Sequence, residues 1–434
     1  MRIDRLVINN FKGFKHRELS FHPEFNLVVG DNGLGKTSVL EALSIAAGSW
    51  FLGLRGYDTR HIKAGEARLE GFITADGVNW EHQYPCIVEA HGRILGNDLT
   101  WKRSLNYTGG RTSYGDARSI KDLASESDEK VRAGEPISLP IISYYSTARL
   151  WDVPREQARV KSSKKIKEKA GLSRLDAYRN SVDPRLSVSD LIEWIARQSW
   201  KAFQQRGFQT PVFATARSAL VQNVQGAKDV YFDAEYGEVI VEFENGTRQP
   251  FNNLSDGQRC MLAVVGDLAR KAATLNPHLG DRVLLETSGV VMIDELDLHL
   301  HPKWQRQVIE DLRTTFPKLQ FICTTHSPFL IQALRSGEEL IMLEGQPTAN
   351  LGDLPLEDIA RGIQGVSNPQ VSARYQEMKQ VARTYLETLE EAQMAPEEKL
   401  EEYQKRLADS IAPYADNPAF QAFLEMKRAA KLGE

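Results

Sequence analysis

The sequence predicts an α/β protein in which helices pack on a mixed sheet and an antiparallel β subdomain lies beside it. An apolar run over 25–29 leads into a glycine-rich loop and then into a helical pattern. Two further strand-like runs, 290–293 and 320–325, end in polar side chains, as buried parallel strands do at the carboxyl edge of a sheet. From about 68 to 142, short strand-like runs alternate with turn residues, which is typical of antiparallel strands.

The first residues predict a hairpin that precedes the apolar strand. Polar and apolar residues alternate over Arg2–Asn9, a turn follows at 11–14, and Arg17–Phe21 is the second strand. The next strand, Phe25–Val29, is mostly apolar and is expected to be buried. In the helix expected over Ser38–Ile45, apolar side chains recur on one face.

The loop between that strand and that helix has the pattern G-x-x-x-x-G-K-[ST], met by Gly30, Gly35, Lys36 and Thr37. Glycines allow a tight turn that aims backbone N–H groups at a phosphate. Lys36 supplies charge for the β- and γ-phosphates, and Thr37 offers a hydroxyl to Mg²⁺. We therefore expect a nucleotide and Mg²⁺ here; the alternative is a glycine-rich turn with a surface lysine. Further candidate contacts of the nucleotide are Asn32, Gly33 and Ser38.

The middle of the chain predicts more strands around a helical insert. Leu139–Arg149 is expected to be a second buried parallel strand with an arginine-bearing loop, and strands return at 230–232 and 239–243. Residues 155–225 carry helical periodicity, which includes a helix expected over Leu191–Phe203. Within them, Lys161–Lys169 is the most basic run; it is suited to nucleic-acid phosphates or an acidic partner, and the alternative is a solvated helix face.

Two carboxylates end the apolar run Val290–Ile293. Asp294 is a candidate ligand of Mg²⁺, directly or through water, and Glu295 is a candidate base that polarises an attacking water. The alternative is a strand that ends in acids at the surface. His326 follows the next strand along the chain and is expected to reach a γ-phosphate, although a lone histidine there is often structural.

A short polar motif precedes the apolar helix expected after residue 259. Ser255 and Gly257 place a hydroxyl and a bare backbone N–H at a helix N-terminus, which favours an anion. The alternative is an ordinary helix cap. His299 and His301 are spaced as a metal pair, but a packed loop is favoured because no third ligand is nearby.

Composition narrows the classes of function. Lys and Arg number 54 against 58 Asp and Glu, so there is no global basic field and nucleic acid can be held only by a local patch. The three cysteines lack metal-ligand spacing and suit a reducing compartment. With no signal-peptide pattern and no apolar run of membrane-spanning length, we expect a cytoplasmic protein without membrane contact.

Taken together, the motifs resemble those of ABC-type P-loop ATPases. Gly30–Thr37 resembles Walker A, Leu254–Gln258 the signature, Val290–Glu295 Walker B, Asp297 the D-loop, and Thr325-His326 the switch histidine. The segments Ile8–Phe14 and Asp294–Pro302 resemble the SMC/RecF/OLD branch of that superfamily. An ABC-type ATPase head is the fold that this resemblance implies.

The resemblance also implies roles for single residues. Lys36 and Thr37 would hold phosphates and Mg²⁺, Asp294 would support the metal, and Glu295 and His326 would be catalytic. ATP would be sandwiched in a head-to-tail homodimer. In it the nucleotide is contacted in trans by Ser255, Gly257 and Gln258, and Lys12 of the N-terminal motif is a further candidate contact. One departure is the missing Q-loop glutamine: Gln83 and Gln157 are poorly placed, and the loop 144–151 could replace it.

The same comparison suggests how the chain is divided. We expect an N-terminal ATPase lobe over 1–154, a helical insert over 155–228, a C-terminal ATPase lobe over 229–350 and a helical region over 351–434. The insert is too short for the long coiled coil of SMC proteins. After Leu343-Glu-Gly345 no D-x-D pair follows, so we expect no Toprim nuclease site in this chain.

The chain further resembles ATPase subunits of two-component bacterial anti-phage systems, such as the Septu ATPase PtuA and the AriA ATPase of PARIS. This implies an ATP-hydrolysing sensor or regulator that forms homo-oligomers and controls an effector nuclease of HNH or Toprim type, with DNA or a phage-encoded protein as trigger. The alternative is a RecF-like repair ATPase that binds duplex DNA directly. A third possibility, a nucleotide-binding scaffold without turnover, would need a lost catalytic group, whereas Lys36 and Glu295 are both present.

Overall fold

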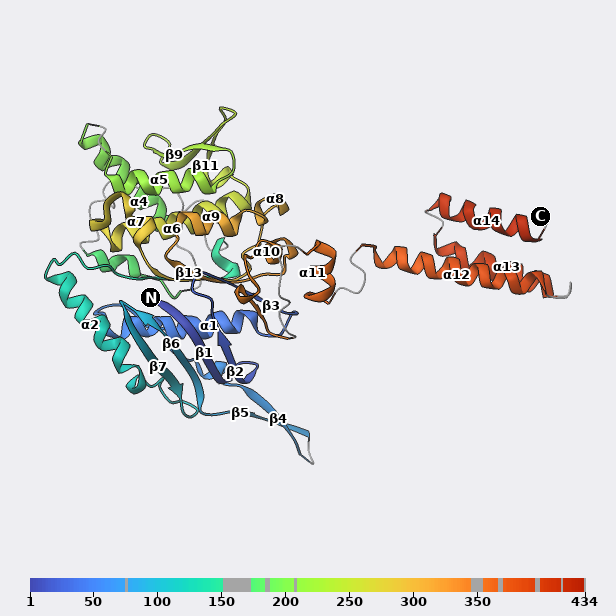
Figure 1. The fold of residues 1–434 in the computed structure, drawn as a ribbon, viewed down its shortest axis with the longest axis horizontal. Coiled ribbons are helices and arrows are strands. Elements are labelled where there is room, and N and C mark those ends of the chain that lie inside the picture. Colours follow the sequence, from blue (N-terminus) through green and yellow to red (C-terminus); the bar gives the residue numbers. More distant parts are fainter. Residues whose placement is uncertain are drawn as a thin grey trace. The chain divides into compact units, whose positions relative to one another are not determined.

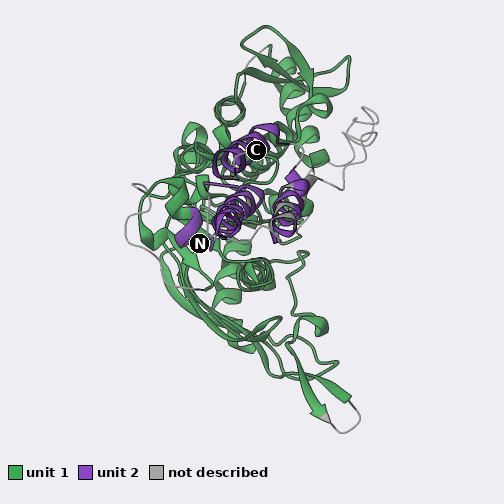
Figure 2. Cartoon of the chain, turned by 90° about the vertical axis from the view of Figure 1, so that its right-hand side faces the viewer, with its two compact units in different colours: residues 1–359 green, residues 360–434 purple. Residues whose placement is uncertain are grey.

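The computed structural model describes two compact units, Met1–Ile359 and Ala360–Glu434 (Figure 2). The residues that it describes are 1–74, 77–150, 173–183, 188–206, 209–344, 354–365, 370–394, 399–414 and 417–432. Gln157, Trp151 and the basic run Lys161–Lys169 lie outside these residues. The division into four segments therefore stays a prediction.

The centre of the first unit is a five-stranded sheet in which every pair of neighbouring strands is parallel (Figure 1). All residues of its three inner strands and of one edge strand are buried, because helices or a second sheet cover both faces. The apolar runs in the sequence predicted these four strands, which is confirmed. In spatial order the strands are β14 (Leu340–Met342), β3 (Phe25–Val29), β13 (Leu319–Thr324), β12 (Gly289–Ile293) and β8 (Ile141–Tyr145).

The antiparallel strands form separate sheets. A four-stranded sheet has the order β2 (Phe14–Ser20), β1 (Arg2–Phe11), β6 (Cys86–Ile94) and β7 (Asn97–Leu105). The hairpin of β4 (Leu69–Thr74) and β5 (Gly77–His82) and the sheet of β9 (Ala227–Asp233), β10 (Glu238–Phe243) and β11 (Arg248–Pro250) are the other two. The α/β class is confirmed, with one refinement. Parallel and antiparallel strands do not share one mixed sheet, because the buried parallel strands are joined by helical crossovers while the hairpins pair locally.

Helix α1 (Lys36–Ala47) lies between the parallel sheet and the four-stranded antiparallel sheet, and it contacts strands of both (Figure 1). Most of its residues are buried for that reason. The indole of Trp101, in β7, donates a hydrogen bond to the carbonyl of Ala46 over 2.9 Å, which fixes the end of the helix on the antiparallel sheet. The glycine loop that precedes α1 is therefore attached to a helix held from two sides.

Helix α2 (Arg118–Arg132) corrects the expectation of strand-like structure up to residue 142. It buries Ile120, Ala124, Ser127 and Asp128, which lie on one face of a helix. Only two of these side chains are apolar, so the helical period was not visible in a sequence read by its apolar residues.

Other helices complete the first unit. The helix expected over Leu191–Phe203 is confirmed as α4. The described helices are α4 (Val188–Gln204), α5 (Pro211–Asn223), α6 (Asp256–Leu275), α7 (Val283–Glu286), α8 (Pro302–Gln305), α9 (Val308–Thr315) and α10 (Pro328–Gln332), and α11 (Leu356–Gly362) contains the boundary between the units. No helix among the described residues combines the length and the apolar character needed to span a membrane.

The second unit consists of helices, as the charged helical patterns of the tail predict. They are α12 (Ala373–Gln393), α13 (Leu400–Ile411) and α14 (Pro418–Leu432). Their shared core is small and consists of Tyr385, Leu389, Leu407 and Leu424. An ion pair of 2.9 Å between Lys431 and Glu390 joins α14 to α12.

Candidate nucleotide site

The glycine loop runs from the end of β3 to the start of α1. Gly35 caps the helix with φ of 94°, a conformation that side chains other than glycine rarely adopt. A Cβ added there would lie 2.7 Å from the ring of Phe14, so the N-terminal motif packs directly against this loop. Asn32 and Gly33 are exposed and Ser38 is half-buried. The loop thus keeps a tight, glycine-dependent turn whose outer residues remain accessible to a ligand.

Lys36 is buried at the start of α1. Its Nζ donates hydrogen bonds to the carbonyl oxygens of Gly30, over 2.7 Å, and Asp31, over 3.1 Å. Burial lowers the pKa of Lys36, while the charges of Glu295 and Asp294 oppose that shift. The ammonium group therefore lies in the field of the two acids that end β12.

Asp294 joins the loop to the end of β12. Its Oδ2 accepts a hydrogen bond from the hydroxyl of Thr37 over 2.9 Å. Its Oδ1 accepts one from the hydroxyl of Thr324 over 2.6 Å, and the same hydroxyl accepts the backbone N–H of Glu295 over 2.7 Å. A hydroxyl and a carboxylate that meet in this way are oxygen donors of the kind that Mg²⁺ binds, so the residues fit that metal.

Sequence reasoning missed Thr324. Its side chain is fully buried at the end of β13 and contacts both acidic residues of the neighbouring strand. Threonine at the end of a strand carries no motif of its own, and only the pairing of β12 with β13 places this hydroxyl beside the acids. The sequence contained part of the information, because it predicted a buried strand directly before the candidate residue His326.

Glu295 has φ of 49°, in the left-handed region that non-glycine residues seldom occupy. Such strain is often found at functional sites, where the surroundings hold the backbone in place. Here the backbone N–H of Glu295 is bound by Thr324 and that of Leu296 by the carbonyl of Thr324 over 2.9 Å. The conformation of the candidate base is therefore set by the adjacent strand.

His326 directly follows the polar end of β13 and is exposed. The residues on either side are anchored: Thr325 donates to a carboxylate oxygen of Asp297 over 2.5 Å, and Ser327 donates to the side-chain oxygen of Gln305 over 2.7 Å. Because β12 and β13 are parallel neighbours, Asp294, Glu295 and His326 lie at the same edge of the sheet. Gln305 is a second contact that no sequence pattern indicated.

The polar motif before α6 forms a separate group. Ser255 is the N-cap of α6, and its side chain and that of Gln258 form a capping box, with the side-chain oxygen of Gln258 2.9 Å from the Ser255 hydroxyl. Among the described residues, no hydrogen bond joins Ser255, Gly257 or Gln258 to the glycine loop. A Cβ added to Gly257 would lie 2.6 Å from the carbonyl oxygen of His299, so this glycine is also needed for packing.

Three further candidates have contacts of other kinds. Lys12 forms an ion pair with Glu41 of α1, so the structure places it against that helix. Gln83 donates to the carbonyl of Glu81 on the β4–β5 hairpin. His301 caps α8 by accepting a hydrogen bond from the backbone N–H of Lys303 over 3.2 Å. This is a structural contact of the kind expected for a packed loop. No cluster of metal-binding residues is found within the described part of the chain.

Tyr144 is the penultimate residue of β8 and the first residue of the segment 144–151. Burial raises its pKa, and the nearby charges of Asp294 and Glu41 act in the same direction. The end of β8 lies beside the end of β12, with Tyr145 opposite Ile293. The first residues of the loop proposed to replace a Q-loop glutamine are thus next to the acidic pair.

A glycine loop with a buried lysine, joined to two acids at the carboxyl edge of a parallel sheet, defines a P-loop ATPase of ABC type. The chain belongs to the family described as "AAA domain, putative AbiEii toxin, Type IV TA system", whose sequence model matches residues 25–332. That match begins at the first residue of β3 and ends at the last residue of α10.

Two similar proteins each share most of their length with this chain. The "Retron Vc95 probable ATPase" of Vibrio cholerae serotype O1 biovar El Tor is 24% identical over 392 residues, which cover 79% of this chain and 74% of the relative. The "Septu protein PtuA" of Bacillus thuringiensis is 24% identical over 84% of this chain and 81% of its own. Among solved structures, an Smc head bound to the C-winged helix domain of ScpA matches 83% of this chain and all of that chain, with TM-score 0.46 and 15% identity.

Proposed function

We propose that this ATPase is the nucleotide-dependent regulator of a bacterial anti-phage system and that it controls a separate effector nuclease. The contact between Thr37 and Asp294 supports ATP hydrolysis, because it joins the phosphate loop to the acid that ends β12. Relatives named as a retron ATPase and a Septu protein support the anti-phage role and the separate effector. The nature of the effector, an HNH or Toprim nuclease, is part of the proposal.

In this proposal the residues of the site divide the work of ATP hydrolysis. Lys36 would turn from the loop carbonyls to the phosphates, and Thr37 and Asp294 would hold Mg²⁺. The metal, when bound, neutralises charge on the phosphates. Glu295 accepts a proton from the attacking water, with its backbone fixed by the β13 end, and His326 contacts the γ-phosphate from the same edge of the sheet.

We propose further that the site is completed by a second copy of the chain. Within the described residues, no hydrogen bond joins Ser255, Gly257 or Gln258 to the glycine loop of the same protomer, and the nucleotide of a partner is the ligand that we propose for them. Helix α6 supports this role, because its N-terminus carries partial positive charge that attracts phosphate. An ATP-dependent, head-to-tail dimer follows from that arrangement.

The test is purification of the Glu295→Gln protein from its host with ATP and Mg²⁺, followed by native mass measurement and identification of bound proteins. Loss of the base should leave ATP bound between protomers, so we expect a dimer or higher oligomer that carries a nuclease in fixed stoichiometry. Lys36→Ala is the control, because it removes the charge that holds the phosphates and should give no ATP-dependent oligomer. A Glu295→Gln protein that turns over ATP at the rate of the wild type contradicts the assignment of the base.

A second candidate function is a RecF-like ATPase that binds duplex DNA. One observation favours it: the "DNA replication and repair protein RecF" of Actinobacillus pleuropneumoniae is 51% identical over 43 residues, 10% of this chain. In the same purification, this function predicts a protein loaded with DNA and without a nuclease. Binding to DNA should then weaken steeply with added salt.

A further inference from the structure

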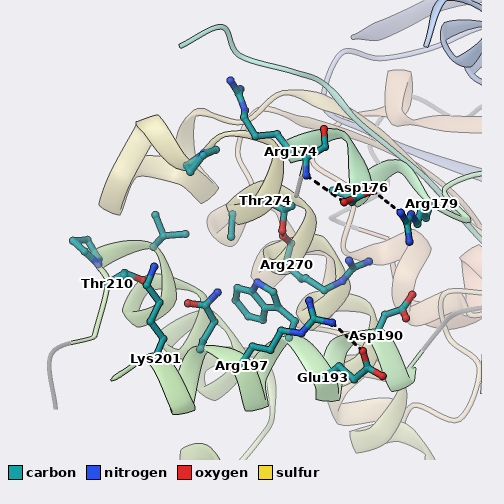
Figure 3. A pocket seen from close by; sticks show the side chains of 18 of the residues that line it. Arg174, Asp176, Arg179, Asp190, Glu193, Arg197, Lys201, Thr210, Arg270 and Thr274 are labelled. Atoms are coloured by element: carbon teal, nitrogen blue, oxygen red, sulfur yellow. Dashed lines mark hydrogen bonds and ion pairs between the residues drawn. The ribbon is translucent and has the colours of Figure 1, made fainter. Parts of the chain in front are cut away.

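A cavity of about 920 Å³ lies in the first unit between α4, the last turns of α6 and the segment 173–179 (Figure 3). None of the nucleotide-site residues lines it. Its wall is rich in charge, with more cationic than anionic side chains. The cationic ones are Arg174, Arg179, Arg197, Lys201 and Arg270, and the anionic ones are Asp176, Asp190 and Glu193.

The cations of this wall are not equivalent. Arg174 stabilises the fold, because its guanidinium donates hydrogen bonds to the carbonyls of Leu275, over 2.7 Å, and of Ile137. Arg197 pairs with Glu193 over 3.3 Å along the surface of α4, a contact that an anionic ligand can replace at small cost. Lys201 has no ion-pair partner within the described residues. It is exposed and lies one helical turn after Arg197.

The same wall offers contacts that an anion alone would not need. Trp194 is half-buried, lines the cavity and meets the ring of Phe213 edge to face at 5.6 Å. It lies about one helical turn before Arg197 on α4, so an aromatic ring and two cations follow each other along one face. Thr210, which also lines the cavity (Figure 3), adds a hydroxyl. The volume is in the range of pockets that hold small molecules of nucleotide size.

We propose that this cavity binds a nucleoside phosphate, with the phosphate held by Arg197 and Lys201 and the planar base against Trp194. A free nucleotide and the terminal nucleotide of a nucleic-acid strand present the same chemistry to these residues. The site is separate from the glycine loop and does not depend on a dimer or an effector.

A chain of short contacts leads from this cavity to the acid pair of the ATPase site. Arg270, in the cavity wall, pairs with Asp267 over 2.6 Å, and the other carboxylate oxygen of Asp267 accepts the hydroxyl of Tyr145 over 2.7 Å. The backbone carbonyl of Tyr145 in turn accepts the N–H of Asp294 over 2.8 Å. Asp267 and Tyr145 are buried, so these contacts are shielded from water. An occupied cavity should therefore change the rate of ATP hydrolysis.

The binding test uses the full chain with Lys36→Ala, which disables the glycine loop, and isothermal titration with AMP and with the 5′-phosphorylated trinucleotide pTpTpT. We expect at least one probe to bind, and Arg197→Ala combined with Lys201→Ala to weaken it at least tenfold. Lys228→Ala is the matched control, because that lysine is exposed, does not line the cavity and pairs with Glu242 on the neighbouring strand β10. Circular dichroism confirms that the variants are folded.

The outcomes distinguish a free nucleotide from a strand end, and they decide whether the proposal stands. Binding of AMP alone indicates a free nucleotide, and binding of pTpTpT alone indicates a strand end. If neither probe binds, or if the double variant binds as tightly as its parent, the proposal is overturned. In the protein with Lys36 intact, the bound probe should change the ATPase rate at least threefold, and Tyr145→Phe should keep probe binding while that change is lost. An unaltered rate overturns the connection between the two sites.

Discussion

At the scale of single residues, the ATPase site depends on a side chain that touches neither ATP nor metal in the proposed mechanism. Thr324 donates to Asp294 and accepts from the backbone of Glu295. One hydroxyl therefore orients the candidate metal ligand and the candidate base together. Outer contacts of this kind are known to matter for metal sites, because they fix the orientation of the direct ligand.

Replacement of Thr324 by Val keeps the shape of the side chain and removes both hydrogen bonds. We expect kcat to fall by about 10- to 100-fold, since Asp294 and the backbone of Glu295 lose their orientation. Steady-state ATPase assays across ATP and Mg²⁺ concentrations measure the change. Thr324→Ser restores the hydroxyl and should recover most of the activity; equal activity of the Val and Ser variants would show that the hydroxyl has no positioning role.

At the scale of elements, buried charged side chains of α6 bind hydroxyl groups of β8. Asp267 pairs with Arg270 and, over 2.8 Å, with Lys271, whose Nζ also donates to the hydroxyl of Ser143 over 2.9 Å. Burial acts to raise the pKa of the Asp267 carboxyl, but the charges of Lys271 and Arg270 outweigh it and hold that pKa below its ordinary value. The ionised carboxylate is therefore part of the folded structure.

The variant Asp267→Asn should lower the free energy of unfolding by about 3–5 kcal/mol at neutral pH, because it leaves buried cations without their counter-charge. Chemical denaturation at pH 7 measures this difference. Because the folded pKa of Asp267 is depressed, its contribution is present above about pH 4 and is lost as the pH falls further, so the gap between wild type and variant should narrow there. Asp98→Asn, in an exposed pair with Arg93, should cost less than about 1 kcal/mol.

The start of α6 gives a second prediction at this scale. Gly257→Ala places a methyl group against the carbonyl of His299, which is backbone and can yield only by a shift of the loop. We expect a loss of about 1–3 kcal/mol in unfolding free energy, seen as a lower Tm in thermal denaturation. The control is Gly65→Ala, where nothing lies within 4 Å of the added atom. Equal melting temperatures would show that this contact is not tight.

The sequence was sufficient to predict the elements that have a strong local pattern. The buried strands β3, β8, β12 and β13 have runs of apolar residues, and the glycine loop has a spacing set by its chemistry. Helix α2 was missed because polar residues fill half of its buried face. Thr324 and Gln305 were missed because their roles depend on which strands and loops become neighbours in space, and that pairing is not encoded in any local pattern.

At the scale of the whole molecule, each compact unit has its own core. In the first unit, α1 packs between two sheets, so the segment that starts at the phosphate loop reaches both layers. In the second, the small core around Tyr385 and Leu389 buries only part of the apolar surface of its helices, and Phe423 and Met426 of α14 stay exposed. Such exposed apolar groups make α14 a place to examine for contacts with the proposed effector.

The packing of Gly257 against His299 has a consequence for the kinetics of the proposed dimer. His299 belongs to the loop that follows a protomer's own Glu295, whereas Gly257 belongs to the group that this protomer offers to its partner's ATP. A movement of that loop in response to one nucleotide would be passed on to the other site. Hydrolysis should then be cooperative, with a sigmoidal dependence of rate on ATP concentration, and dimers with one Glu295→Gln subunit should lose more than half of the activity.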